Sequence, residues 1–195
     1  MLKRSFKYVL PILALLFLVI VVKGVYNIGA LELLVGGMVG MFLPDLDHFV
    51  YIYFLRPQEL TCQRVKQALS RGQYRLSVNL IMDSHNERIE LIFHTALFHI
   101  VFFVLSFLVI TSSGSIFGRG LVLAALMHLT IDQYLELKAG RGGGPTVFTT
   151  GQPQGSNKQG IHNWFNNLGV ALTLRQEKFY LWGMFALTLV LALVF

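Results

Sequence analysis

The sequence predicts an all-α integral membrane protein, a bundle of about five transmembrane helices with amphipathic helices at the membrane surface. Of the 195 residues, 54% are hydrophobic and 16 are Phe. Only 13% are charged, whereas a soluble domain carries roughly 25%. Long apolar segments recur along the chain, and a helix needs about 20 apolar residues to cross a bilayer.

Five apolar segments are the candidates for these helices, at about residues 8–27, 28–43, 89–111, 116–135 and 179–195. The second and the fifth are short, so their full passage through the membrane stays open at this stage. Within the second, the Gly36-x3-Gly40 spacing predicts a face that packs closely against another helix of the same chain. We treat residues 1–195 as a single membrane domain.

The basic residues predict the orientation of the helices, because Lys and Arg gather on the cytosolic side of a membrane protein. With a cytosolic N-terminus and alternating crossings, 14 of the 16 Lys and Arg residues are cytosolic, and only Lys23 and Arg119 lie outside. The same arrangement makes the protein multi-pass with an external C-terminus. The net charge of +6 then favours contact with anionic membrane lipid, and we expect no direct nucleic-acid partner.

Two cytosolic segments follow from this topology. Residues 56–83 mix charged and apolar positions and predict an amphipathic segment on the inner leaflet, in two pieces around Gly72. Residues 139–160 contain seven glycines and predict a Gly-rich cytosolic loop. After that loop we expect an interfacial helix with Trp164 and Phe165 as anchors. Cys62 is the one cysteine, which excludes a disulfide within the chain.

Three groups of ionisable side chains lie in or beside the apolar segments, where such groups are costly and mark function. They are Asp45, Asp47 and His48 after Pro44; Glu90, His94 and His99 in the third segment; and His128 and Asp132 in the fourth.

Helical geometry constrains these groups. Ser84 and Glu87 have the spacing of a capping box, which predicts that the third helix starts near His85. Glu90 and His94 would then share one face, whereas His94 and His99 would lie about 140° apart. His128 and Asp132 are four residues apart and share a face. The topology brings all three groups to the cytosolic leaflet.

Imidazole and carboxylate groups together suit Zn²⁺ or another borderline divalent cation. The candidate metal ligands are Asp45, Asp47, His48, His94, His99, His128 and Asp132. They exceed the number that one tetrahedral ion needs, so one or two ions are expected. The candidates for a catalytic base are Asp45, Glu90 and Asp132, and the sequence does not choose among them.

The order Pro44-Asp45-Leu46-Asp47-His48, His94-x4-His99, His128-x3-Asp132 resembles the bacterial inner-membrane metal-dependent hydrolases, the YdjM-like, LexA-binding family. The resemblance implies a multi-helix protein of the inner membrane and a hydrolase related to zinc-dependent phospholipases. The chain departs from the family at Thr95, Phe98 and Ile100, where Arg, Thr and Ser are usual.

The leading functional hypothesis is a metal-dependent hydrolase that cleaves a phosphoester or ester, lipid-linked, at the cytosolic face. Arg64, Arg71 and Arg75 are the candidates for binding an anionic head group. One alternative is a proton or metal conduit, against which the external half offers only Glu32 as a polar step. Another is a non-catalytic membrane scaffold with a relict metal site, which the departures from the family pattern support. The sequence does not predict the oligomeric state.

Overall fold

The computed structural model describes residues 2–83, 91–139, 162–165 and 172–195, and within these ranges it contains helices and no strand. The all-helical prediction is confirmed. The helices are α1 (Leu2–Lys23), α2 (Ile28–Phe42), α3 (Leu46–Val50), the π-helical turn η1 (Tyr51–Leu55), α4 (Leu60–Ser70), α5 (Tyr74–Asp83), α6 (Ala96–Ser112), α7 (Ile116–Ala139), α8 (His162–Phe165) and α9 (Leu174–Val194).

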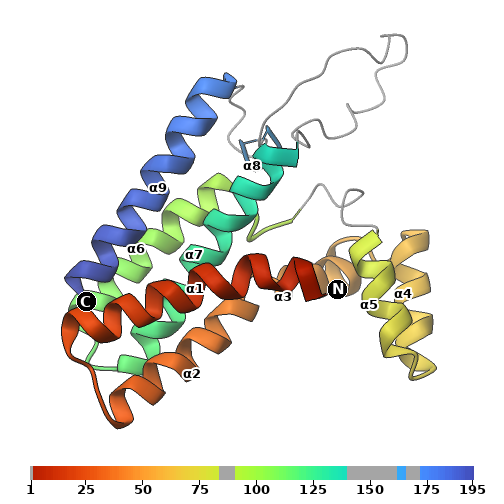
Figure 1. The fold of residues 1–195 in the computed structure, drawn as a ribbon. Coiled ribbons are helices and arrows are strands. Elements are labelled where there is room, and N and C mark those ends of the chain that lie inside the picture. Colours follow the sequence, from red (N-terminus) through yellow and green to blue (C-terminus); the bar gives the residue numbers. More distant parts are fainter. Residues whose placement is uncertain (1, 84–90, 140–161, 166–171) are drawn as a thin grey trace.

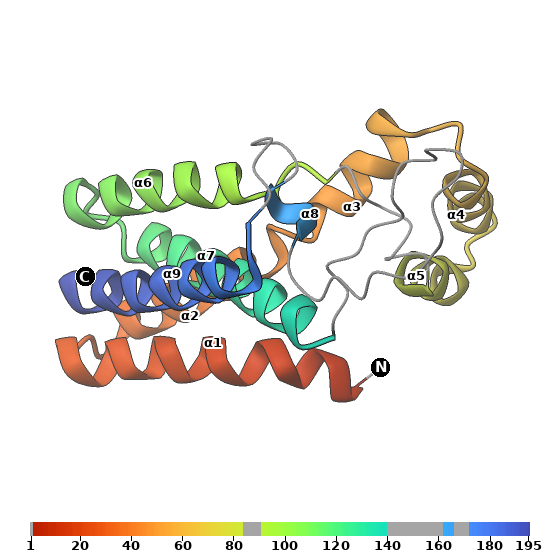
Figure 2. The same ribbon diagram turned by 90° about the horizontal axis from the view of Figure 1, so that it is seen from above.

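The five apolar segments correspond to α1, α2, α6, α7 and α9, which form a bundle with α7 at its centre (Figures 1 and 2). Helix α7 packs against the other four, and it supplies much of the main core, including Leu123, Ala124 and Leu126, which are fully buried. The two chain ends lie at opposite ends of the bundle (Figure 2).

Two stretches are long and apolar enough to cross a membrane by length and composition, Ile28–Leu55 and Leu174–Val194. The core helix of a soluble protein can pass the same test, but only 33% of each apolar window is buried inside the bundle. Large apolar side chains are instead exposed on the outside of several helices, among them Phe17 at 66%, Met38 at 62% and Val190 at 55%. Such an apolar exterior is typical of an interaction surface.

The contact between α2 and α7 depends on glycine. A Cβ at Gly36 would collide with the carbonyl oxygen of Phe117, and one at Gly40 with that of Leu121. From the other side, a Cβ at Gly120 would collide with the carbonyl oxygen of Leu33. The two backbones therefore touch, as the Gly36-x3-Gly40 spacing predicts. Because residue 36 meets 117 and residue 40 meets 121, the two helices run in the same direction.

Helices α4 and α5 form a hairpin beside the bundle, beyond the N-terminal end of α1 (Figure 1). They are separated at Gly72, whose φ of 69° is one that glycine adopts readily, so the predicted division at this residue is confirmed. The apolar face of α4 is buried, with Val65 at 0% exposure, and packs onto η1. This apolar face of α4 therefore packs within the protein, and the placement of residues 56–83 on the inner leaflet stays a prediction.

Two further expectations need correction, and others fall on residues that the structure does not describe. Residues 91–95 are not helical, since α6 begins at Ala96, so the predicted helix start near His85 is wrong for this stretch. Trp164 and Phe165 are 1% and 3% exposed and pack in the core, so they are not surface anchors. The proposed capping residues 84 and 87, and the Gly-rich loop from residue 140 onward, lie outside the described residues.

The glycine contact makes a prediction about stability. Gly40→Ala should lower the melting temperature in detergent, because the methyl group would push α2 from α7; overpacking of this kind costs about 1–3 kcal/mol. Gly183→Ala in α9 is the matched control, since no atom lies within 4 Å of its added Cβ. This control should hold or raise the melting temperature, because Ala is the better helix former. Equal melting temperatures for the two variants would contradict the account.

Candidate functional site

The first group of polar residues owes its position to Pro44. Proline lacks an N–H group and its ring conflicts with the carbonyl four residues earlier, so α2 ends at Phe42. The chain then makes tight turns with hydrogen bonds between residues three apart. The N–H of Leu46 donates to the oxygen of Leu43 at 3.2 Å, and that of Asp47 donates to the oxygen of Pro44 at 3.1 Å. Beyond Pro44 the chain continues into α3 and η1. Asp47 becomes fully buried, at 0% exposure.

The second group is placed by the segment before α6. Thr95 is the N-cap residue, with extended backbone, and its hydroxyl accepts from the N–H of Phe98 at 3.2 Å. Residues before the cap are free of the helix, so the N–H of Phe93 donates to Asp47 Oδ2 at 2.6 Å. This bond fixes His94 beside Asp47, with Nδ1 at 3.3 Å from Oδ2.

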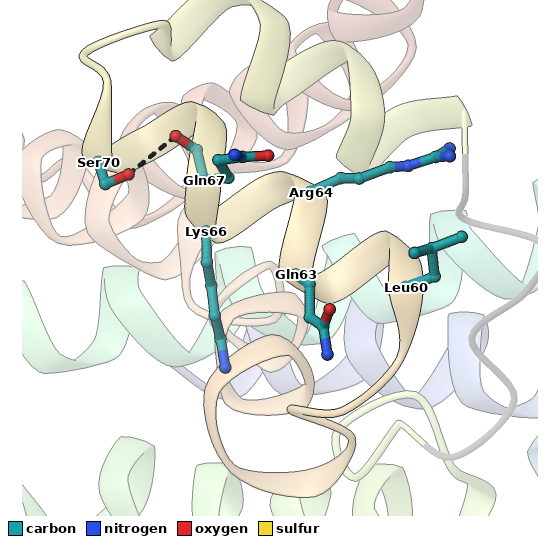
Figure 3. A pocket seen from close by; sticks show the side chains of 6 residues that line it. All are labelled: Leu60, Gln63, Arg64, Lys66, Gln67 and Ser70. Carbon is teal, nitrogen blue, oxygen red and sulfur yellow. Dashed lines mark hydrogen bonds between the residues drawn. The ribbon is translucent and has the colours of Figure 1, made fainter.

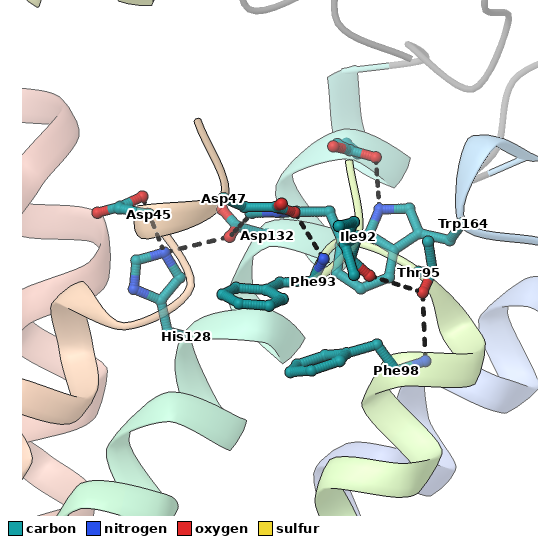
Figure 4. Close-up of polar contacts among 11 residues, drawn as sticks. Asp45, Asp47, Ile92, Phe93, Thr95, Phe98, His128, Asp132 and Trp164 are labelled. Carbon is teal, nitrogen blue, oxygen red and sulfur yellow. Dashed lines mark hydrogen bonds and ion pairs between the residues drawn. The ribbon is translucent and has the colours of Figure 1, made fainter. Parts of the chain in front are cut away.

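The third group comes from α7, and it joins the first two (Figure 4). Asp132 Oδ2 lies 3.2 Å from His94 Nε2 and also 3.2 Å from His128 Nε2. His128 Nε2 is in turn 3.7 Å from Asp45 Oδ1. The i,i+4 spacing that the sequence shows is what puts His128 and Asp132 on one face of the helix. Asp132 thus connects two imidazoles from separate parts of the chain.

Tyr8 of α1 completes this group, and sequence reasoning missed it. Its hydroxyl donates to Asp132 Oδ1 at 2.7 Å, and its ring stacks on His128 with centroids 4.8 Å apart. A Tyr near the end of an apolar helix is usual at a membrane interface, so the sequence carries no signal for this contact. We define the polar cluster as Tyr8, Asp45, Asp47, His94, His128 and Asp132.

His94 lies between two carboxylates, and they dominate its charge state. Burial alone would lower the pKa of His94, but its hydrogen bonds with Asp132 and Asp47 outweigh burial and raise that pKa to about 10. In the metal-free protein, the His94 ring is therefore protonated at neutral pH and can donate a hydrogen bond from each of its two nitrogens. A cation at Nε2 has to displace a proton, so metal binding should strengthen as the pH rises.

The remaining candidates lie at different distances from the cluster. The ring of His48 stacks on that of His94, with centroids 5.6 Å apart. Glu90 lies outside the described residues. In the described part of the chain, Arg64, Arg71 and Arg75 belong to the α4–α5 hairpin and form no ion pair with the cluster.

His99, one of the candidate metal ligands, does not contact the polar cluster in the described residues. It is fully buried within α6, and its Nδ1 lies 3.0 Å from Gln133 Nε2. The separation follows from the start of α6, since His94 precedes the helix and bends toward Asp47 while His99 stays on it. Trp164 contacts both rings, with its centroid 5.7 Å from that of His94 and 6.3 Å from that of His99. Its indole N–H donates to Glu136 at 2.8 Å.

A metal site can be tested against these distances. Two ligands of one tetrahedral zinc ion are about 3.3 Å apart, given metal–nitrogen bonds of about 2.0–2.1 Å, and both His–Asp132 distances are 3.2 Å. In the described residues, however, no group of three or more His, Cys, Asp or Glu side chains is already arranged to hold a metal ion. The candidate ligand side chains contact one another in pairs. In the described residues, the buried atoms Asp47 Oδ1 and His128 Nδ1 have no hydrogen-bond partner.

Comparisons with known proteins add no relative: no family model, no curated protein and no solved structure matches this chain. The likeness to the YdjM-like hydrolases therefore rests on the three motifs.

The contact with Tyr8 makes a prediction. Tyr8→Phe keeps the ring against His128 but removes the donor to Asp132, so the melting temperature of metal-free protein should fall. A hydrogen bond to a charged group contributes about 1.5–3 kcal/mol. Tyr26→Phe is the control, since Tyr26 is 63% exposed and should tolerate the change. If both variants have the melting temperature of the wild type, the hydrogen bond from the Tyr8 hydroxyl to Asp132 does not stabilise the protein.

Proposed function

We propose that this protein is a metal-dependent hydrolase of the inner membrane that cleaves a phosphoester or ester in a lipid-linked substrate at the cytosolic face. The observation that carries the proposal is the meeting of His94, His128 and Asp132, where one carboxylate oxygen lies 3.2 Å from both imidazoles. His94 comes from the segment before α6, whereas His128 and Asp132 both come from α7. The three residues meet at one end of the apolar bundle.

These three side chains are the proposed metal ligands. Catalytic zinc sites usually have three protein ligands and keep a position for water or substrate. Asp47 supports this assignment, because it faces Nδ1 of His94 at 3.3 Å while Nε2 points to Asp132. A carboxylate on the far nitrogen is the usual means of orienting a histidine ligand. We therefore assign Asp47 an orienting role, in place of the ligand role expected from the sequence.

Asp45 is the proposed general base. Its side chain is 50% exposed, whereas that of Asp132 is 13% exposed, so Asp45 can exchange protons with solvent. Its Oδ1 lies 3.7 Å from His128 Nε2, at the edge of the cluster. A bound divalent cation supplies a water with a pKa near 7. Asp45 would take the proton of that water as it attacks and return it to the leaving oxygen.

The membrane placement is part of the proposal. We infer that α1, α2 with its continuation, α6, α7 and α9 cross the bilayer, with the N-terminus in the cytosol and the C-terminus outside. Three facts support this: the two long apolar stretches, the exposed apolar side chains, and the distribution of Lys and Arg in the sequence. The cluster then lies near the cytosolic ends of the helices.

A conduit function is less well supported. The buried hydroxyls of Ser106, Thr130 and Thr188 each donate to a carbonyl one turn earlier in their own helix. In the described residues these groups do not extend the polar cluster toward the other end of the bundle. A proton or ion path would need such an extension.

Metal analysis of purified protein tests the ligands. Wild type should carry stoichiometric divalent metal, and His94→Ala and His128→Ala should each lose it, because either change leaves two ligands. His99→Ala is the matched control and should retain metal, since His99 bonds Gln133 away from the cluster. Helicity by circular dichroism confirms folding. Wild type without metal after metal loading would sink the proposal, as would loss confined to His99→Ala.

A second experiment separates an enzyme from a scaffold with a metal site. Asp45→Asn should retain metal but lose about 10²- to 10⁴-fold in the hydrolysis of phospholipid in detergent micelles, the range for removal of a general base. A chelator should abolish wild-type hydrolysis, and added Zn²⁺ should restore it. Metal-loaded wild type that cleaves neither phosphoester nor carboxylic ester bonds would favour the scaffold.

A further inference from the structure

The outer face of α4 carries a shallow groove with a volume of about 660 Å³. Leu60, Gln63, Arg64, Lys66, Gln67 and Ser70 line it (Figure 3). The lining includes two cations and no carboxylate. Residues 56–75 hold five Lys or Arg and one acid, Glu59, and the carboxylate of Glu59 accepts from the Tyr51 hydroxyl at 3.0 Å. The groove is therefore electropositive.

The hairpin presents this basic face outward because the apolar face of α4 packs against η1. Cys62 and Val65 are buried together with Tyr51 and Ile52 of η1, and Ala68 of α4 is buried as well. Arg64 is exposed, and Lys66 is half-buried with its ammonium over the ring of Tyr53, 5.3 Å from the centroid. Insertion of α4 into a bilayer through its apolar face would require the hairpin core to open. Contact through charge requires no rearrangement.

The position of the groove relative to the membrane follows from its place in the sequence. The apolar stretch Ile28–Leu55 ends five residues before α4 begins at Leu60. If that stretch crosses the membrane, as in the proposed function on which this inference rests, α4 starts at the level of the lipid head groups. Phe54 is 80% and Leu60 is 64% exposed at this junction. They are apolar neighbours suited to the boundary between head groups and acyl chains.

We propose that the α4 groove binds the head group of an anionic phospholipid of the surrounding membrane. Arg64 presents a planar donor array to the phosphate. The side chain of Lys66 points in a different direction from that of Arg64 (Figure 3) and adds to the positive potential of the same outer face. Gln63 and Gln67 can donate further hydrogen bonds. The groove is a lipid contact outside the polar cluster, so it replaces the sequence-based role of Arg64 in holding the hydrolysed substrate.

Native mass spectrometry of the full chain in detergent tests this assignment, with dioleoyl phosphatidylglycerol and dioleoyl phosphatidylcholine as the probes. Wild type should bind phosphatidylglycerol more tightly. An Arg64→Gln/Lys66→Gln variant should lose about tenfold to thirtyfold of that preference, at about fivefold for each cation near an anionic surface. The charge-conserving Arg64→Lys/Lys66→Arg variant should retain most of it, and 0.5 M salt should weaken it.

Arg175→Gln/Lys178→Gln is the control, because it removes the same charge from two exposed positions of α9. The inference is overturned if this control loses as much preference as the α4 variant, or if the α4 variant keeps the wild-type preference. It is also overturned if millimolar inorganic phosphate displaces the lipid, which would make the groove a site for free phosphate. Should the double variant misfold, Arg64→Gln alone gives the same comparison. Lipid binding has no catalytic readout, so this result is independent of the hydrolase assignment.

Discussion

The backbone contact between α2 and α7 is the constraint on which the candidate site depends. Gly36 and Gly40 of α2 lie against the carbonyls of Phe117 and Leu121, so the two helices run side by side in the same direction. From there α2 passes through Pro44 to Asp45, while α7 rises two to three turns to His128 and Asp132. A larger residue at the contact would separate the helices and move Asp45 away from His128.

A buried charge in an apolar bundle is costly unless a group of opposite charge lies beside it. In the polar cluster every carboxylate faces an imidazole: Asp47 faces His94, Asp132 faces both His94 and His128, and Asp45 faces His128. Opposite charges at these distances offset part of the cost of burial. Two buried atoms, Asp47 Oδ1 and His128 Nδ1, still lack a hydrogen-bond partner in the described residues. Such groups are rare, and a catalytic role or a bound ion is one of their explanations. A divalent cation would reduce the remaining repulsion among the carboxylates.

Much of the fold could be predicted from sequence, and the reasons are physical. Apolar segments of helical length mark α1, α2, α7 and α9, and the i,i+4 spacing of His128 and Asp132 is a local property of one helix. The start of α6 could not be predicted, because apolar residues flank His94 and Thr95 on both sides and their pattern does not show that Thr95 caps the helix. That cap frees His94 to reach Asp47. The contact of Tyr8 with Asp132 joins residues 124 positions apart, and no local pattern reports it.

X-ray absorption spectroscopy of the purified, zinc-loaded protein tests the proposed metal centre most directly. We expect a nitrogen and oxygen shell at about 2.0–2.1 Å, with the outer-shell scattering of two imidazoles from His94 and His128. In Asp132→Asn this shell should change while both imidazoles remain. A sulfur shell at about 2.3 Å, which only Cys62 or a methionine could supply, or a spectrum without imidazole scattering, would contradict it.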